Sequence, residues 1–156
     1  MITHAEYERH LFWMKKAIAL AEIAGQSGEI PVGAIIVDNR DQILAQSGNR
    51  KEKETDPTAH AEVLAIRTAS RHRQNWHLND CSLYVTLEPC PMCAGAIIHS
   101  RLKTVIYGAD DPKTGVLRSV ANFPDALFSN HRLNVIGGIA SNDCRQLLQT
   151  WFMRNR

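Results

Sequence analysis

The sequence predicts an α/β protein, a three-layer α/β/α sandwich built on a mixed five-stranded sheet. Three observations favour this class. Short apolar runs that suit buried strands alternate with stretches of helical periodicity. Strands separated by helices pair in parallel through crossover connections, which place helices on both faces of the sheet. The chain has 156 residues, of which 44% are hydrophobic, so we expect residues 1–156 to form one domain with its own core.

The first expected helix covers residues 3–24. Apolar side chains recur there at helical spacing, and Thr3 and Glu6 form a capping box at the start. Gly25 is expected to stop the helix, because glycine accepts the backbone conformation that ends helices.

A hairpin and a loop are expected next. Residues 32–37 form a short apolar run that suits a buried strand. A turn at 39–41 leads into residues 42–48, the expected partner strand. The polar residues 49–57 then predict a loop.

A second helix is expected to begin close to His60. Asp56 or Thr58 is expected to cap it, and it ends near Arg73. Residues two apart lie on roughly opposite sides of a helix interior. His60 and Glu62 can therefore serve one pocket only if the helix starts there and points its end at the site.

The strand expected over 81–87 leads straight into Cys90 and Cys93, which open a third helix that ends near 99–101. The cysteines are three residues apart and hence on one face, and the prolines around Cys90 are tolerated only near a helix start. Two helix N-termini would then converge on one site, where their positive ends favour thiolate over thiol.

Two more strands and a last helix complete the prediction. The strands cover 104–107 and 133–136, and Ser141 or Asn142 caps a helix that runs to Phe152. In such sheets ligands bind beyond the carboxyl ends of the strands, which is where Cys90 is delivered.

These residue types predict a catalytic zinc site. His60, Cys90 and Cys93 offer the nitrogen and sulfur ligands that zinc prefers, and a fourth position remains for water. A lone C-x-x-C would equally suit redox chemistry or half of a structural zinc site, but the pairing with H-x-E matches the signature of zinc nucleobase deaminases. The prediction is that a zinc-bound hydroxide attacks a heterocycle while Glu62 shuttles protons, releasing ammonia. The His-Glu-x-x-His motif of metalloproteases is absent.

Composition bounds the partners. The net charge is +2 and the pI about 8.4, which permits a nucleic-acid partner without requiring one. Basic residues gather at several places, including the carboxyl-terminal Arg154 and Arg156. No signal peptide or membrane-spanning run is seen, so we expect a cytoplasmic protein that contacts no membrane. Cys81 and Cys144 are expected to be buried core residues and not disulfide partners.

Longer strings resemble the cytidine deaminase superfamily, and within it the bacterial tRNA-specific adenosine deaminases, over almost the whole chain. The strings are EIPVGA at 29–34, DPTAHAE at 56–62, LYVTLEPCPMCAGA at 83–96, GADDPKTG at 108–115 and NHR at 130–132. The resemblance to the tRNA branch depends mainly on the string GADDPKTG at 108–115 and on the Asn130-His131 pair.

The resemblance implies a cytidine deaminase-like fold and conversion of the wobble adenosine to inosine in the anticodon stem-loop of a tRNA, expected to be an arginine tRNA (tRNA-Arg). It implies one zinc ion (Zn2+) per subunit, a homodimer that contacts the RNA, and Glu62 as the proton shuttle. By matching positions, Asn49 would hydrogen-bond the flipped base and Ile30 would help to wall the pocket. For Asn49, a turn or capping role is the alternative.

Three other functions remain open at this point. The nearest is a zinc-dependent deaminase of a free base or nucleotide such as guanine or cytosine, and substitutions of Lys113 and Arg132 would separate it from an RNA deaminase. A redox protein using Cys90 and Cys93 leaves His60 and Glu62 unexplained. A non-catalytic RNA-binding module with structural zinc would need a fourth strong ligand.

Overall fold

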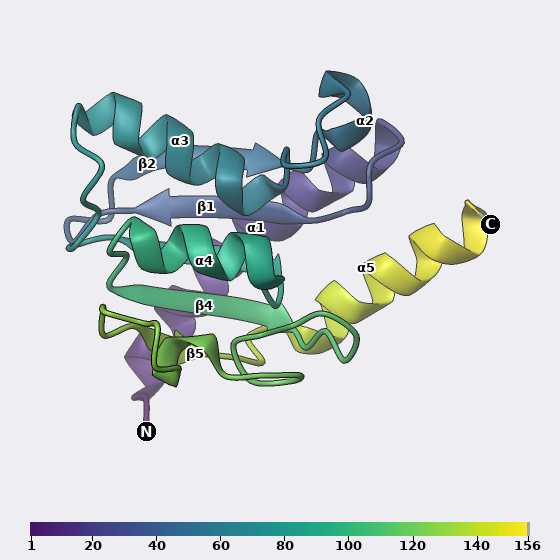
Figure 1. Cartoon of the computed structure of the whole chain (residues 1–156). Helices are drawn as coiled ribbons and strands as arrows, with labels where there is room; N and C mark the ends of the chain where they lie inside the picture. The colour runs from purple at the N-terminus through teal and green to yellow at the C-terminus, as the bar shows by residue number, and fades with distance from the viewer. Residues whose placement is uncertain (156) are drawn as a thin grey trace.

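A single mixed sheet organises the chain, with its strands in the order β2-β1-β3-β4-β5. Figure 1 shows β2, β1, β4 and β5 one after another across the sheet. The structure is a computed structural model that describes residues 1–155. The strands are β1 Gly33–Val37, β2 Ile43–Gly48, β3 Ser82–Leu87, β4 Thr104–Ala109 and β5 Asn134–Ile136. The helices are α1 His4–Gln26, α2 Lys51–Glu54, α3 Ala61–Arg73, α4 Pro91–His99 and α5 Ser141–Arg154, with a 3-10 turn η1 at Phe123–Asp125.

Strand direction decides which segments meet at each edge of the sheet. β1 runs antiparallel to both β2 and β3, whereas β3, β4 and β5 are parallel to one another. The amino end of β1 therefore lies at the same edge as the carboxyl ends of β2, β3 and β4. All the candidate site residues are found at this edge.

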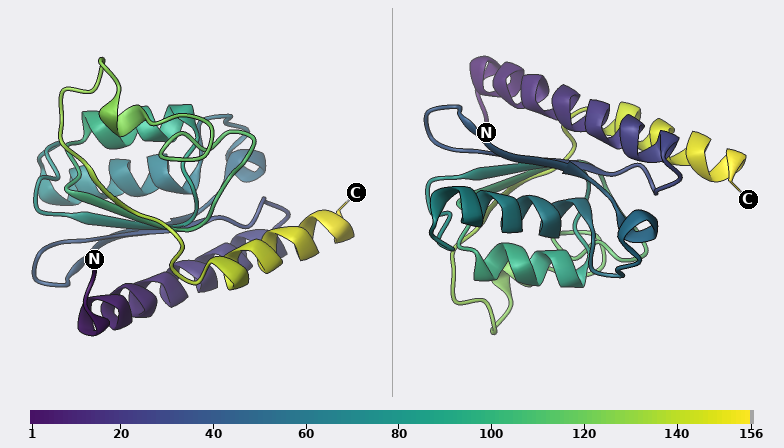
Figure 2. Two further views of the ribbon diagram at one scale, coloured as in Figure 1. Left: turned by 90° about the horizontal axis from the view of Figure 1, so that it is seen from below. Right: turned by 90° about the horizontal axis from the view of Figure 1, so that it is seen from above.

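Helices cover both faces of the sheet, with α1 and α5 on one face and α3 and α4 on the other (Figure 2). Successive residues of a strand point to opposite faces. Along β3, Leu83 and Val85 pack in the cluster below α3 and α4, whereas Tyr84 packs with Trp13 of α1. The predicted three-layer sandwich with a mixed five-stranded sheet is confirmed. Within the described residues, no helix has the length and apolar character needed to span a bilayer.

The predicted capping residues of α3 and α5 are both wrong. The residue that caps α3 is His60, and its side chain makes no capping bond, while Asp56 instead accepts hydrogen bonds from the backbone and hydroxyl of Thr58. At α5 the cap is Ala140, in a left-handed conformation with φ of 56°, so Ser141 already lies inside the helix. In both places the local turn, and not a capping side chain, sets where the helix begins.

Two boundaries in the first half also differ from the prediction. α1 continues past Gly25 to Gln26, and the carbonyl of Gly25 accepts a hydrogen bond of 3.2 Å from the Trp151 indole of α5. A side chain at position 25 would crowd that indole. The expected polar loop contains the short helix α2, because the buried carboxylate of Glu29 accepts hydrogen bonds from two of its backbone N–H groups.

The two remaining cysteines are buried free thiols, as predicted. Cys81 is fully buried and Cys144 is 1% exposed, and burial raises the pKa of each thiol to about 12. Cys144 packs where Gly108 of β4 has no side chain, since a Cβ at that position would lie 2.3 Å from its sulfur. The glycine lets α5 rest directly on the sheet.

A histidine on the buried face of α1 makes the stability of the fold depend on pH. His10 is 8% exposed, and its Nδ1 lies 2.8 Å from the hydroxyl of Tyr84. Burial lowers the pKa of His10 below its ordinary value of 6.5, and the nearby charge of Arg9 lowers it further. The folded protein therefore favours the neutral imidazole.

We expect His10→Gln to flatten the dependence of stability on pH below 6.5. The unfolded chain binds a proton at His10 as the pH falls below 6.5, whereas the folded chain resists it. This contribution to stability is complete above that value and is lost at lower pH, by at most about 1.4 kcal/mol per pH unit. Urea unfolding of both proteins between pH 5 and 8 measures it. Parallel curves for the two proteins would contradict the assignment.

Candidate active site

The candidate site residues come from different strand ends that share one edge of the sheet. Asn49 follows β2, Cys90 follows β3 and Asp110 follows β4, while Ile30 precedes β1. The strand directions bring these four positions to one place although they are far apart in the sequence. All four line one pocket. This is the place where ligands bind in open α/β sheets.

Three side chains in this edge form a compact cluster with the donor atoms of a metal site. The Nδ1 atom of His60 lies 3.7 Å from the sulfur of Cys90 and 3.4 Å from that of Cys93. His60 precedes the first residue of α3, and Cys90 precedes the first residue of α4. The two helix N-termini therefore converge, as the sequence predicts. Their positive ends favour the anionic form of the sulfur ligands.

The cluster fits zinc in composition and in geometry. In a tetrahedral site with Zn–N near 2.0 Å and Zn–S near 2.3 Å, nitrogen and sulfur lie about 3.5 Å apart. The two measured separations bracket that value. Over residues 1–155, the group of possible ligands here consists of His60, Cys90 and Cys93 alone. Three protein ligands and a free fourth position are typical of catalytic zinc sites.

The two thiols differ in how they hold their protons. The pKa of Cys90 is lowered to about 4, first by a hydrogen bond from Cys93 and then by His60. The pKa of Cys93 is raised, because its proton is held against the Cys90 sulfur and the group is buried. Contact with the Cys90 sulfur raises the pKa of His60. One thiolate is thus ready as a ligand, and a cation would displace the second proton.

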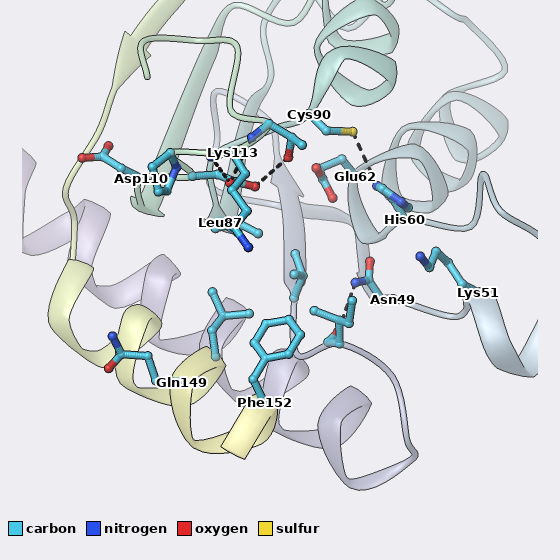
Figure 3. A pocket seen from close by; sticks show the side chains of 16 residues that line it. Asn49, Lys51, His60, Glu62, Leu87, Cys90, Asp110, Lys113, Gln149 and Phe152 are labelled. Carbon is cyan, nitrogen blue, oxygen red and sulfur yellow. Dashed lines mark hydrogen bonds between the residues drawn. The ribbon is translucent and has the colours of Figure 1, made fainter. Parts of the chain in front are cut away.

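Glu62 lies beside this cluster, in the first turn of α3 (Figure 3). Its side chain is 4% exposed, and burial raises the pKa of the carboxyl group. It lines the pocket together with His60 and Cys90, whereas Cys93 is fully buried behind them. A buried carboxyl group of raised pKa that faces a pocket is suited to accept and return protons.

The pocket has a volume of about 680 Å³ and extends from the metal cluster to α5. Phe152 of α5 enters it from the side opposite His60 and Cys90 (Figure 3). Two lysines, Lys51 of α2 and Lys113 of the segment after β4, also line it. The pocket thus combines an apolar wall, a polar floor and charges of both signs, since Asp110 and Asp111 line it as well.

Asn49 and Ile30 both lie in the pocket wall. The amide oxygen of Asn49 accepts a hydrogen bond of 2.8 Å from the backbone N–H of Ala61, at the start of α3. Its amide nitrogen donates one of 3.0 Å to the carbonyl of Ile30. Asn49 thus ties the Ile30 loop to α3, and one amide N–H is left for a ligand.

Sequence reasoning missed the contribution of α5 and α2 to this pocket. The expected last helix includes Leu148, Gln149 and Phe152 but was given no role at the site, and Lys51 falls in the expected loop over 49–57; all four line the pocket. Spacing along α5 could have indicated that these three side chains share one face, but not that the helix reaches the site. Arg132 is not at the site, because its neighbour His131 bonds the Leu102 carbonyl at the opposite edge. Arg156 lies outside the described residues.

An α/β/α sandwich with a histidine and two cysteines at converging helix ends defines a zinc-dependent deaminase of the cytidine deaminase type. The profile of the family "Cytidine and deoxycytidylate deaminase zinc-binding region" matches residues 7–109. A tRNA-specific adenosine deaminase of Haemophilus influenzae is 46% identical over 143 residues, covering 92% of this chain and 83% of that protein.

Solved structures agree with the sequence relatives. One, from a study of A-to-I editing by tRNA:A34 deaminases at the wobble position of transfer RNA, has a TM-score of 0.84 and 39% identity. That match covers 86% of this chain and 97% of the other. Guanine deaminase from Bacillus subtilis has a TM-score of 0.59 and 29% identity over 99% of this chain and 96% of the other. The chain belongs to the cytidine and deoxycytidylate deaminase family, in the branch of the tRNA-specific adenosine deaminases.

Proposed function

We propose that this enzyme deaminates the wobble adenosine of a tRNA anticodon loop to inosine, with an arginine tRNA (tRNA-Arg) as the substrate. The observation that carries the proposal is Glu62 beside the His60–Cys90–Cys93 cluster on the floor of a pocket of about 680 Å³. That volume is within the range of sites for small molecules and single nucleotides. The relatives named for the same activity support the choice of substrate.

In this proposal His60, Cys90 and Cys93 hold one zinc ion per subunit. When bound, zinc acidifies a coordinated water enough to supply a nucleophile near neutral pH. Glu62 would take up one proton of the attacking water and pass it to N1 of adenine, and it would then carry the second proton of the same water to the amino group, which leaves C6 as ammonia. Water replaces the amine, so adenosine becomes inosine.

The pocket walls would select and hold the base. An anticodon loop presents an unpaired base that can turn into a pocket at modest cost. The second amide N–H of Asn49 would donate a hydrogen bond to the edge of the purine. Ile30 and Phe152 would offer apolar surface to the faces of the purine ring. Lys51 and Lys113 would meet the phosphates on either side of the target.

The proposal includes a cytoplasmic homodimer of one-domain subunits. Exposed apolar side chains on and beside α4 support the dimer: Met92 is 36% exposed, Val120 56% and Phe128 64%. Phe128 packs on Phe123 of η1, which contacts α4. Burying such side chains favours association of two copies. Sedimentation of the zinc-loaded protein at the monomer mass would contradict it.

The test is single-turnover deamination by the zinc-loaded protein of two kinds of substrate. One is an arginine tRNA anticodon stem-loop with a wobble adenosine, and the other is a set of free nucleosides and bases that includes guanine. We expect inosine in the stem-loop and no ammonia from the free compounds. Ammonia from guanine alone would instead establish the activity of the guanine deaminase relative and overturn the proposed substrate.

Lys113→Ala is expected to weaken stem-loop binding and to lower the slope of log affinity against log salt by about one. Lys113 lines the pocket, so its ammonium group can meet a phosphate there. Arg132→Ala is the matched control, because it removes an equal charge at the opposite edge of the sheet. The measurement is a binding titration at several salt concentrations. Equal losses in the two variants would refute a local role for Lys113.

A further inference from the structure

The segment between β4 and η1 forms one wall of the pocket without regular secondary structure. Five consecutive residues of this segment line the pocket: Asp110, Asp111, Pro112, Lys113 and Thr114. A segment outside helices and sheets must satisfy its backbone N–H groups elsewhere. Four of them, those of Asp111, Leu117, Arg118 and Ser119, converge on the buried carboxylate of Glu88, whereas those of Lys113 and Thr114 bond the carboxylate of Asp111.

Glu88 accepts hydrogen bonds from both ends of the wall segment. Its Oε1 accepts the backbone N–H of Asp111 at 3.1 Å and the hydroxyl of Ser119. Its Oε2 accepts the backbone N–H groups of Leu117, Arg118 and Ser119 at 3.1, 2.9 and 3.0 Å. Hydrogen bonds to an ionised acceptor are roughly twice as strong as neutral ones.

The carboxylate of Glu88 is tightly packed against the wall segment. Glu88 is 1% exposed, although it carries a charge. The wall segment passes so close that a Cβ on Gly115 would lie 2.4 Å from the Glu88 carboxyl carbon. A buried charge is tolerated only when it is fully hydrogen-bonded, so the wall and the carboxylate stabilise each other.

Glu88 also stands next to the metal cluster in the chain. It is two residues before Cys90, and the carbonyl of the intervening Pro89 accepts the backbone N–H of Val116 at 3.1 Å. Residues 88–90, directly after β3, thus include both a proposed zinc ligand, Cys90, and the carboxylate that anchors the 110–114 wall, Glu88. A movement of Asp111 or Val116 away from the stretch that carries Cys90 would break these bonds.

We propose that Glu88 is a positioning residue, which sets the distance between the 110–114 wall and the His60–Cys90–Cys93 cluster and thereby the binding of the substrate nucleotide. The proposal rests on the function proposed above. Glu88 does not touch the substrate in this scheme. It acts through the backbone of Asp111 and, by positioning the wall, through Lys113.

Glu88→Gln is the most selective test, because the amide places a donor where the carboxylate has only acceptors. If the amide nitrogen takes the Oε1 position, Ser119 can turn its hydroxyl to accept, but the Asp111 N–H loses its partner. The other orientation would oppose three N–H groups. The substitution therefore releases the pocket end of the wall and spares the end at 117–119.

We expect the half-saturating stem-loop concentration of Glu88→Gln to rise about tenfold, while the maximal single-turnover rate changes less than about threefold. Zinc content should equal that of the wild type. Amide hydrogen exchange should increase in residues 110–115 and stay unchanged in β3 and α3. A lower maximal rate together with zinc loss would overturn the proposal, since it would show that Glu88 serves the cluster itself.

Two further variants keep the test decisive if Glu88→Gln folds poorly. Gly115→Ala wedges a methyl group between the same wall and Glu88 without changing charge, so the same rise in half-saturating concentration is expected. Ser119→Ala removes one hydroxyl bond and leaves the Asp111 bond intact, so it is the matched control and should bind the stem-loop as the wild type does. Unchanged exchange at 110–115 in both test variants would overturn the proposal even if the wild type acts on another substrate. Absence of wild-type activity on the stem-loop would overturn only the proposed function.

Discussion

Glu62→Gln is expected to lower the single-turnover rate by about 10³-fold or more while the protein keeps its fold and its zinc. General acid–base catalysis contributes about 10²–10⁴-fold, and here one carboxylate is assigned both the acid and the base step. Glutamine has nearly the same shape, so it fits the buried position of Glu62. Burial disfavours the charged form of the Glu62 carboxyl group and raises its pKa, so replacing it by a neutral amide is expected to leave the stability equal or higher.

The measurement combines stem-loop deamination, metal analysis and thermal unfolding of the same preparation. Glu52→Gln is the matched control, because it makes the same chemical change on the exposed surface of α2, close to the Lys51 rim of the pocket. The control should react at the wild-type rate. Substantial activity in Glu62→Gln would remove Glu62 from the proposed chemistry.

Cys93→Ala is expected to lose both zinc and activity. Cys93 is fully buried behind the pocket, so no solvent molecule can readily replace its sulfur as a ligand. Losing even an outer partner of a metal site costs about 10- to 100-fold in affinity, and losing a direct ligand is expected to cost more. The apparent melting temperature should fall as well, because the metal binds only the folded chain.

Cys144→Ala is the control for this prediction. It removes a thiol that is equally buried but lies in α5, outside the metal cluster. We expect that variant to keep one zinc per subunit and its activity, with a moderate loss of stability from the cavity. His60→Ala and Cys90→Ala should behave as Cys93→Ala does. Full zinc occupancy in any of these three would show that the ligand set is wrong.

The roles of Asn49 show what a match of sequence positions cannot predict. Its position predicts contact with the base, and its alternative is a capping or turn role. The structure shows its oxygen bonded to the first turn of α3 and its nitrogen bonded to the Ile30 carbonyl. It therefore has a structural role, and it also lines the pocket. Which hydrogen bonds an amide makes depends on neighbours that are distant in the chain.

The first residues of the helices show that prediction from sequence is also limited within short segments. The sequence placed His60 and the cysteine pair at the beginnings of two helices, because proline and polar residues restrict where helices can start. It assigned the caps to Asp56 or Thr58 and to Ser141 or Asn142, and all four assignments are wrong. At α3 the first backbone N–H, that of Ala61, bonds the side chain of Asn49, so a residue from outside the local sequence satisfies the helix end.

The fold class, the family and the three clustered side chains could all be predicted from the sequence, because these depend on residue types and on spacings within short segments. His60, Cys90 and Cys93 could be read from two motifs. The tertiary structure alone decided which remote segments complete the pocket. Strand order brought Asn49 and Asp110 to the same edge, and the packing of α5 on β4 brought Phe152 across the site. The anchoring of the 110–119 segment on Glu88 was likewise invisible, because a hydrogen-bond network between segments leaves no periodic pattern in either one.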